Sequence, residues 1–477
     1  MPAVVATAST PQTPESRERR NAFLTLAVAF VMEIVDGTIV NVAVPAIRAD
    51  LGASAQAMQW SVAGYSLAFA VLLISGGRAG DIFGYRRLFM IGMTGFTLAS
   101  LLCGIAATPE QLVLARLAQG AAAALMAPQV MALIQLLYPP AERVHVLARF
   151  GLLGGISAVF GSVLGGVLIR ANIGGLDWRP IFLINVPVGL AGLAAAKRFL
   201  PDARSQLTPR LDVPGNLLAI ATVFAFVFPL AEGRAMGWPI WCVTILLSAP
   251  ILCVFLVRHL RRRSMRQQAV LIDPILFQDA GFAIGVLISL LFWTAAGGFL
   301  FVLTLALQIG RGLDPLQTGL IHMPFAIGVG FGVALLGRKV LPHLGRNVLV
   351  LGAAVMALAI ATLAFTITIG AALFSVGAAL LFAGLGMGVV SGPLSPIALA
   401  RVDPAHAGAA SGALKSVQQL GTALGAGVLG GLYFAWAGDA YDASLARLAM
   451  VPAVAAMIAL LIGVIVLSRR LPQKLFD

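Results

Sequence analysis

The chain has 477 residues, of which 60% are hydrophobic and only 11% are Asp, Glu, Lys or Arg. Soluble domains carry about 25% charged residues, so this composition excludes a soluble multidomain enzyme and a disordered protein. It indicates a polytopic membrane protein, whose spanning helices each need about 20 mostly apolar residues. The apolar runs are unbroken and rich in Leu, Ala and Gly, so we expect helices and not a β-barrel.

The formal net charge of +13 has two explanations. In a soluble protein it would suggest a nucleic-acid partner. In a membrane protein, basic loops on the cytoplasmic side explain it, so no nucleic-acid partner is expected. Cys103, Cys242 and Cys253 lie inside apolar runs without metal-ligand or redox spacing, and we interpret them as packing residues. No metal or cofactor is expected.

The chain alternates between apolar spans and short polar segments. Residues 1–20 are polar and are predicted to be a disordered cytoplasmic tail, since no signal-peptide cleavage site follows. Fourteen spans are predicted: 21–42, 57–77, 88–107, 109–137, 146–169, 178–200, 212–232, 238–260, 278–309, 315–337, 347–366, 370–397, 408–436 and 446–468.

The basic residues orient these spans. With the N-terminal tail inside the cell, 25 of the 32 Lys and Arg residues fall in cytoplasmic segments and 6 fall in outer segments. The positive-inside rule therefore predicts an even number of spans with both termini in the cytoplasm. We expect a multi-pass protein of a cytoplasmic membrane that acts as a monomer.

The spans group into two blocks. An N-terminal six-helix bundle (21–200) and a C-terminal six-helix bundle (278–470) flank a two-helix insert (201–260) and a basic cytoplasmic linker (261–277). A second tail (471–477) ends the chain. Each block has a basic, Gly-containing loop after its second helix, GGRAGDIFGYRR (76–87) and LGRKVLPHLGRN (336–347). Many secondary transporters consist of two such repeats around a midplane site.

The predicted membrane interior holds few ionisable residues, and three of them are the clearest candidates. Glu33 and Asp36 are three residues apart on one helix face, and Arg116 is the clearest base. Two close, desolvated carboxylates cannot both ionise cheaply, so one is expected to carry protons during transport. Alternatively, Arg116 neutralises the acids without any role in transport, or it snorkels to an interface. The nearly isosteric change Asp36→Asn is expected to stop coupled transport and leave the fold intact.

The loop after the second span is a candidate gate. Gly77, Gly80 and Gly84 permit a tight turn, Asp81 can dock on a helix N-terminus, and arginines can bind cytoplasmic carboxylates. We expect it to latch onto the start of the thirteenth span at Asp403–Pro404. The alternative is an ordinary basic turn. The gating residues predicted are Gly77, Asp81, Gly84, Arg86 and Arg87.

Other polar and aromatic side chains in the spans are candidates for a substrate cavity. They are Asn41, Trp60, Tyr65, Gln119, Trp293, Gln308, Gln418 and Gln419. Scattered aromatic residues are also common as packing residues or interface anchors. His322 is interpreted as structural rather than as a proton relay, and Lys415 is expected to snorkel to the cytoplasm.

These residues resemble the major facilitator superfamily and, within it, the 14-helix drug/proton antiporter branch. The similarity covers nearly the whole chain. The motifs that carry it are DGTIVNVAVP (36–45), the loop from Gly77 to Arg87, the R-x-x-Q-G motif from Arg116 to Gly120, WRPIFLINVP (178–187), LDVPGNLL (211–218) and EGRAMGW (232–238). The resemblance implies the major facilitator fold, with two six-helix bundles plus two additional transmembrane helices.

The resemblance also implies a function, that of a proton-coupled antiporter that exports amphipathic organic compounds by alternating access. The alternatives are a dedicated exporter of one natural product and a non-transporting sensor on the same fold; a membrane enzyme is disfavoured because no catalytic motif is present. The antiporter helix keeps Gly161, Gly165 and Gly166 but has Ser157 and Ser162 where the family has Gly and Pro. Lys415 stands where the family usually has Asn.

Overall fold

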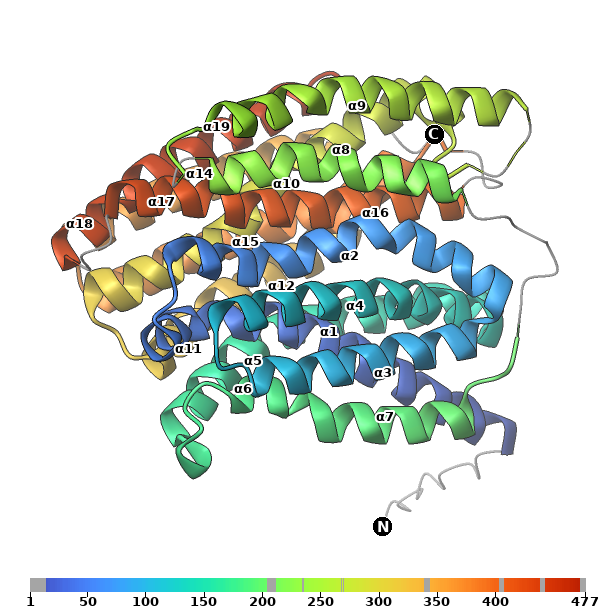
Figure 1. The fold of residues 1–477 in the computed structure, drawn as a ribbon, viewed down its shortest axis with the longest axis horizontal. Coiled ribbons are helices and arrows are strands. Elements are labelled where there is room, and N and C mark those ends of the chain that lie inside the picture. The colour runs from blue at the N-terminus through green and yellow to red at the C-terminus, as the bar shows by residue number, and fades with distance from the viewer. Residues whose placement is uncertain are drawn as a thin grey trace, which may run out of the picture.

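The computed structural model describes residues 14–203, 212–233, 236–266, 268, 270–338, 344–402, 407–437 and 442–471. Within these ranges every regular element is a helix, and the long helices run roughly parallel or antiparallel to one another (Figure 1). The described residues contain 13 helices long and apolar enough to cross a membrane. The fifth predicted span corresponds to α5, whose described side chains give a shorter apolar stretch, Phe160–Ala171. The prediction of an all-helical membrane protein is confirmed.

Seven helices form the N-terminal half. They are α1 (Pro14–Leu51), α2 (Ala55–Phe83), α3 (Tyr85–Gly104), α4 (Pro109–Leu137), α5 (Pro140–Ala171), α6 (Pro180–Leu183) and α7 (Asn185–Phe199), with the short helix η1 (Ile173–Gly175) before α6. Helix α1 begins at Pro14, so the predicted tail 1–20 extended too far into the first helix. The change from polar to apolar residues had marked residue 21 as the start, whereas the helix includes polar residues before the apolar run.

The insert consists of α8 (Val213–Glu232) and α9 (Ile240–Met265). The C-terminal half contains η2 (Pro274–Gln278), α10 (Ala280–Leu305), η3 (Ala306–Gly310), α11 (Pro315–Ile321), α12 (Met323–Arg338), α14 (Asn347–Thr368), α15 (Leu373–Leu399), α16 (Ala407–Leu424), η5 (Gly425–Leu429), α17 (Gly430–Ala437), α18 (Ala443–Leu448) and α19 (Met450–Ser468). Helix α9 continues into the predicted linker 261–277, so its first arginines are helical.

Local capping explains where several helices begin. The side chains of Ser54, Thr108 and Asp279 each accept a hydrogen bond from a backbone N–H in the first turn of the following helix. Asp314 and Gln317 form a complete capping box at α11. These bonds satisfy N–H groups that have no partner within the helix. Gly84, between α2 and α3, has φ 97°, a conformation that favours glycine and permits the predicted tight turn.

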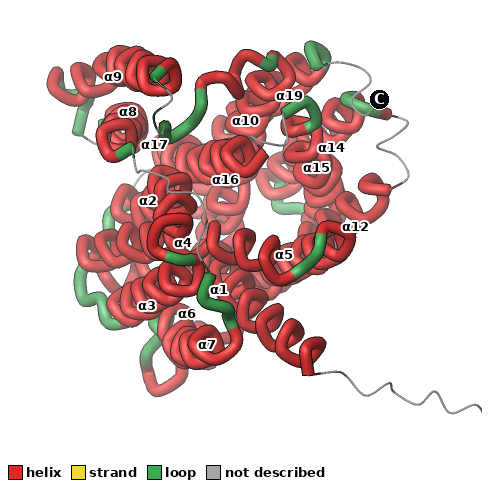
Figure 2. The backbone as a smooth tube through the Cα atoms, turned by 90° about the vertical axis from the view of Figure 1, so that its right-hand side faces the viewer, coloured by secondary structure: helices red, strands yellow, loops and turns green. Residues whose placement is uncertain are grey.

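The two halves repeat the same helix pairings. In the N-terminal half α1 packs on α5, α4 packs on both α2 and α3, and α3 packs on α7. In the C-terminal half α10 packs on α16, α15 packs on both α12 and α14, and α14 packs on α19. Figure 2 shows α3, α4 and α7 on one side and α10, α14 and α15 on the other. This repetition supports the predicted bundles, whose boundaries stay a prediction.

The insert lies against the junction of the two halves (Figure 2). One apolar cluster joins Leu67 of α2, Val227 of α8 and Ala423 of α16. The buried Asp212, which caps α8, also accepts hydrogen bonds from His259 at 2.9 Å and from the backbone of Leu271 at 3.3 Å. The insert therefore contacts both halves along one face of α8, and Asp212 joins its two helices to each other and to the linker.

The two ends of the helix bundle differ. We call them the Leu51 end, where α1 leads into α2, and the Phe83 end, where α2 leads into α3. At the Leu51 end Gln308 Nε2 donates to the backbone oxygen of Val42 at 2.9 Å, joining the two halves. Arg170 lies 3.8 Å from the Asp314 carboxylate. The halves are therefore in direct polar contact at the Leu51 end.

Candidate functional site

The site is centred on Asp36, which lies midway along α1 between residues 21 and 51. Its side chain is fully buried, and Arg116 on α4 is 1% exposed. Arg116 Nη1 lies 2.5 Å from Asp36 Oδ2 in a charge-assisted hydrogen bond. The structure therefore pairs the predicted acid and base, and Arg116 does not snorkel to an interface.

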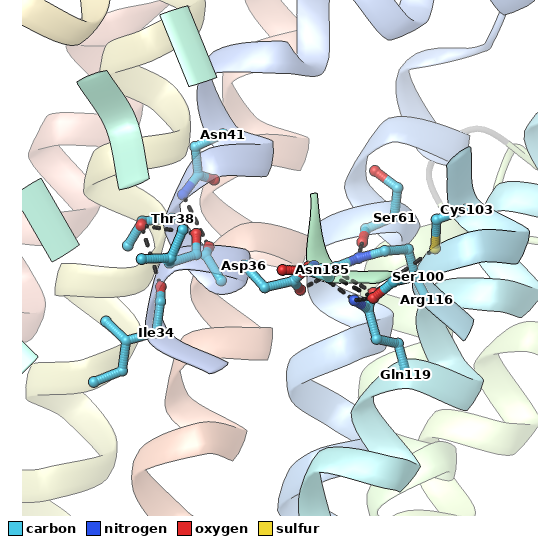
Figure 3. A network of polar contacts seen from close by, with 12 residues as sticks. Ile34, Asp36, Thr38, Asn41, Ser61, Ser100, Cys103, Arg116, Gln119 and Asn185 are labelled. Atoms are coloured by element: carbon cyan, nitrogen blue, oxygen red, sulfur yellow. Dashed lines mark hydrogen bonds and ion pairs between the residues drawn. The ribbon is translucent and has the colours of Figure 1, made fainter. Parts of the chain in front are cut away.

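Two amides complete the coordination of the Asp36 carboxylate. Gln119 Nε2 and Asn185 Nδ2 each donate to Asp36 Oδ1 at 2.8 Å. The hydroxyl of Ser100 accepts from the same two amides, at 2.8 Å from Gln119 and 3.3 Å from Asn185. Figure 3 shows these side chains converging from α1, α3, α4 and α7. The network thus joins four helices of the N-terminal half around one buried charge.

Arg116 is held from several sides. Its Nε donates to the backbone oxygen of Ser61 at 2.9 Å, and its Nη1 also donates to Gln119 Oε1 at 2.6 Å. The guanidinium lies 4.4 Å from the centroid of the Tyr65 ring, a cation–π geometry. A Cβ on Gly120 would overlap the backbone of Tyr65, so this glycine allows α4 close enough to α2 for these contacts.

Glu33 stands outside the network. Glu33 is 8% exposed, and among the described residues no hydrogen bond or ion pair reaches its carboxylate. Asp36 acts on it by repulsion, and Lys415 of the opposite half acts on it by attraction. A buried carboxylate without donors is costly, and a proton removes that cost. Glu33 is therefore the less stabilised of the two acids in this conformation.

The predicted cavity residues fall into different environments. Asn41 donates weakly to Gly37 O at 3.5 Å and leaves its buried Oδ1 without a partner. Tyr65 and Trp293 likewise have a buried polar atom without a hydrogen-bond partner among the described residues. These three groups could accept or donate hydrogen bonds to a bound compound, because polar groups buried without partners are costly.

Other predicted cavity residues have protein partners. Gln119 belongs to the Asp36 network, Gln308 joins the halves, and Gln418 donates to Ser395 Oγ at 3.2 Å. Trp60 packs in the apolar cluster beside α8, 6.1 Å from the Phe228 ring, and its role in a cavity stays a prediction. Gln419 is half-buried and Lys415 is exposed.

The predicted gating loop is held by its own residues and by α7. Asp81 Oδ1 accepts from the Tyr85 hydroxyl at 3.0 Å. Arg86 donates to Leu200 O at 3.2 Å and to the carboxylate of Asp202 at 3.0 Å. Arg87 is exposed, and Gly77 approaches Pro128 of α4. The predicted latch partner, Asp403–Pro404, lies outside the described residues.

The three glycines of the predicted antiporter helix serve different contacts. A Cβ on Gly161 would overlap Thr38 and Val35 of α1, and one on Gly165 would overlap Ile39. A Cβ on Gly166 would instead overlap the backbone of α11 in the opposite half. Gly161 and Gly165 thus pack the N-terminal half, whereas Gly166 lies at the contact between halves.

Sequence reasoning missed Ser61, Ser100 and Asn185 as site residues. Asn185 lies within the stretch WRPIFLINVP, where a polar residue in an apolar run gave a signal. Ser100 lies on a helix dense in small residues and gave none. Ser61 contributes through its backbone oxygen, which no side-chain pattern reveals.

Replacing Asn185 by Ala should destabilise the protein. The change removes one of two amide donors from Asp36 Oδ1, and the loss of a partner to a buried charged group costs about 1–3 kcal/mol. Thermal unfolding in detergent would measure this as a lower midpoint. Thr362→Ala on the exposed face of α14 is the control. Equal midpoints for the two variants would contradict the expected role of Asn185.

A sequence model described as the Major Facilitator Superfamily matches residues 26–426. The chain belongs to this superfamily. Solved major facilitator structures support the fold. A bacterial homologue of the human lysosomal transporter Spinster, solved in an inward-facing and occupied conformation, has a TM-score of 0.67 at 15% identity, over 98% of this chain and 99% of the other.

Several curated relatives are exporters or resistance proteins. The probable actinorhodin transporter of Streptomyces coelicolor is 40% identical, covering 87% of this chain and 73% of the relative. The puromycin resistance protein pur8 of Streptomyces alboniger is 34% identical over 88% of this chain and 82% of the relative. The multidrug resistance protein Stp of Mycobacterium tuberculosis H37Rv is 31% identical, over 90% and 79%. The chain is thus a multi-pass transporter of this superfamily and not an enzyme.

Proposed function

We propose that this protein is a proton-coupled antiporter that exports amphipathic organic compounds across a bacterial cytoplasmic membrane. The observation that carries the proposal is the pair of mid-helix acids on α1 in unlike environments. Asp36 is fully coordinated, and Glu33 is without a hydrogen-bond partner among the described residues. An ionisable residue inside a membrane bundle marks a proton or ion pathway by default.

The charge distribution supports an orientation with the Phe83 end in the cytoplasm. Arg78, Arg86 and Arg87 lie at this end. The segments predicted to be cytoplasmic contain these three residues and most other basic residues of the chain. The Leu51 end, where the halves are in contact, then faces outward. The outer gate is closed in this conformation, and substrate enters from the cytoplasm or the inner leaflet.

Proton exchange is assigned to Glu33, and conformational coupling to the Asp36–Arg116 pair. A proton on Glu33 removes the long-range electrostatic attraction to Lys415, which lies on α16 in the other half and forms no ion pair with it among the described residues, and so weakens the attraction between the halves. The Asp36 network holds α1, α3, α4 and α7 as a unit, so that a change at Glu33 moves α1 with its partners. A membrane potential of 100 mV supplies about 2.3 kcal/mol per charge moved.

The relatives support organic antibiotics as the substrate class. One relative is named for actinorhodin and another for puromycin, whereas a third is a multidrug resistance protein. The single-compound names favour a second candidate, a dedicated exporter of one natural product. Transport of a panel of unrelated compounds would favour the multidrug function, and transport of one compound would favour the dedicated exporter.

Glu33→Gln should abolish substrate-driven proton flux and retain substrate binding. The change removes the titrating group, and among the residues that the structure describes no hydrogen bond depends on it. Proteoliposomes with an imposed pH gradient and an internal pH dye would report flux on addition of puromycin, ethidium or another panel compound. Glu110→Gln, at an exposed glutamate that begins α4, is the matched control.

Two results would count against this function. Undiminished flux in the Glu33 variant would remove Glu33 from the proton pathway. A wild-type protein that binds compounds without any proton flux would favour a sensor on the same fold.

A further inference from the structure

A basic groove lies on the surface of the N-terminal half, at the Phe83 end. It has a volume of about 720 Å³. Its lining comes from the end of α2, the first half of α3, the end of α7 and the segment after α7. Helices α3 and α7 lie side by side (Figure 1). The groove is separate from the Asp36 network, and nothing in the proposed transport cycle uses it.

The charged lining is cationic and partly unpaired. Arg86, Arg87 and Lys197 line the groove together with one acid, Asp202. Arg86 is paired with Asp202 at 3.0 Å, but the Asp202 side chain is 60% exposed. Arg87 and Lys197 are exposed, and among the described residues neither has a hydrogen bond or an ion pair. Within the described part of the chain, two cations therefore face the groove without an ion-pair partner.

The apolar lining distinguishes this groove from a site for a small soluble anion. Phe83 and Ile91 line it and are 48% and 49% exposed. On α3, Arg87, Ile91 and Leu98 recur at helical spacing on one face, and Leu98 is also exposed. The cations thus lie at the helix end, and an exposed apolar strip runs from them toward the middle of the bundle.

The same order holds on the neighbouring helix. Lys197 lies in the last turn of α7, and Leu190, about two turns earlier on the same face, is 58% exposed. Two antiparallel neighbouring helices thus present cations at one level and apolar side chains nearer the middle of the bundle. This is the polarity profile of a phospholipid, with the phosphate at the membrane surface and acyl chains within.

We propose that the groove between α3 and α7 binds the phosphate headgroup of an anionic phospholipid of the cytoplasmic leaflet, held by Arg87 and Lys197. The leaflet assignment rests on the proposed orientation; the binding itself does not. The lipid phosphate competes with Asp202 for Arg86, so binding loosens the link between the gating loop and the end of α7.

Binding of cardiolipin to the purified full chain in detergent, measured by native mass spectrometry, tests the proposal. One Lys or Arg near a lipid surface changes affinity by about fivefold, so Arg87→Gln and Lys197→Gln should each weaken cardiolipin binding about fivefold. Arg198→Gln is the matched control, because Arg198 is exposed beside Lys197 but does not line the groove. Asp202→Asn should strengthen binding, since it removes the acid that competes for Arg86.

Several outcomes would overturn the proposal. The first is that both groove variants bind cardiolipin as tightly as the wild type. The second is that Arg198→Gln weakens cardiolipin binding as much as the groove variants do. The third is that Asp202→Asn binds cardiolipin no more tightly than the wild type. Displacement of cardiolipin by an equal concentration of inorganic phosphate would show a site for soluble anions instead. Equally tight binding of phosphatidylcholine would show that the groove does not select lipids by their negative charge. The assay requires no transport, so its failure leaves the proposed antiport function untouched.

Discussion

Asp36→Asn is expected to lower the free energy of unfolding by about 3–5 kcal/mol and to abolish transport, because it leaves the Arg116 guanidinium buried beside a neutral amide. Arg116 is 1% exposed and cannot reach water without displacing α2 or α4. On the sequence alone, the near match in shape between Asp and Asn indicates an intact fold. The structure adds that Arg116 is buried and ion-paired with Asp36, so we expect the loss of the charge to reduce stability although the shape is nearly kept.

The compensating variant separates stability from function. Asp36→Asn combined with Arg116→Gln removes both charges, so most of the lost stability should return, whereas transport should not. Chemical unfolding in detergent and export of a panel compound from vesicles measure the two properties. A double variant as unstable as Asp36→Asn would show that the ion pair is not the source of the destabilisation.

Gly166→Val is expected to hold the Leu51 end open and to reduce transport strongly. A Cβ at this position would overlap the backbone at Pro315 and Leu316 in the opposite half. Overpacking of this kind costs about 1–3 kcal/mol, and a bias of that size changes the population of a conformation about 5- to 150-fold. Since the strain is relieved when the halves separate at this end, the closed state should lose population while the fold persists.

Thiol labelling would detect the change. In a background without native cysteines, Asn41→Cys should react faster with a membrane-impermeant maleimide from outside the cell when Gly166→Val is present. Gly161→Val is the matched control on the same helix, because its Cβ would overlap Thr38 and Val35 within the N-terminal half. That control should lower the unfolding midpoint without exposing residue 41. Equal labelling rates with and without Gly166→Val would refute the gating role of this contact.

Much of the site could be predicted because charged side chains inside a membrane carry a high free-energy cost. Asp36 and Arg116 are charged residues in apolar spans, and such residues are rarely left without a partner or a function. Sequence could not indicate that Ser100 and Asn185 join them, since a serine or an asparagine in a span is tolerated in many settings. Nor could spacing separate Glu33 from Asp36: both share one turn of α1, but only Asp36 faces the donors on α4 and α7.

Tertiary packing also decided the surroundings of Trp60 and Gly166. The residue type of Trp60 suits a cavity, and only the structure shows that the insert helix α8 packs beside it on α2. In the sequence, Gly161, Gly165 and Gly166 form one motif. The adjacent glycines Gly165 and Gly166 nevertheless face α1 and α11, because successive residues on a helix point about 100° apart. Only the arrangement of α1, α5 and α11 shows which glycine touches the opposite half.

The amino-acid sequence by itself determined that the protein is a bundle of membrane helices, where most of them lie, and which acids and bases they carry. It could do so because each backbone polar group inside a bilayer must be satisfied within its own helix, which makes long apolar runs helical regardless of their neighbours. Tertiary structure alone decided which faces of those helices meet. Spans that are apolar all round carry little periodic signal. The contacts that select one face come from distant segments, 149 residues away between Asp36 and Asn185 and 266 residues away between Val42 and Gln308.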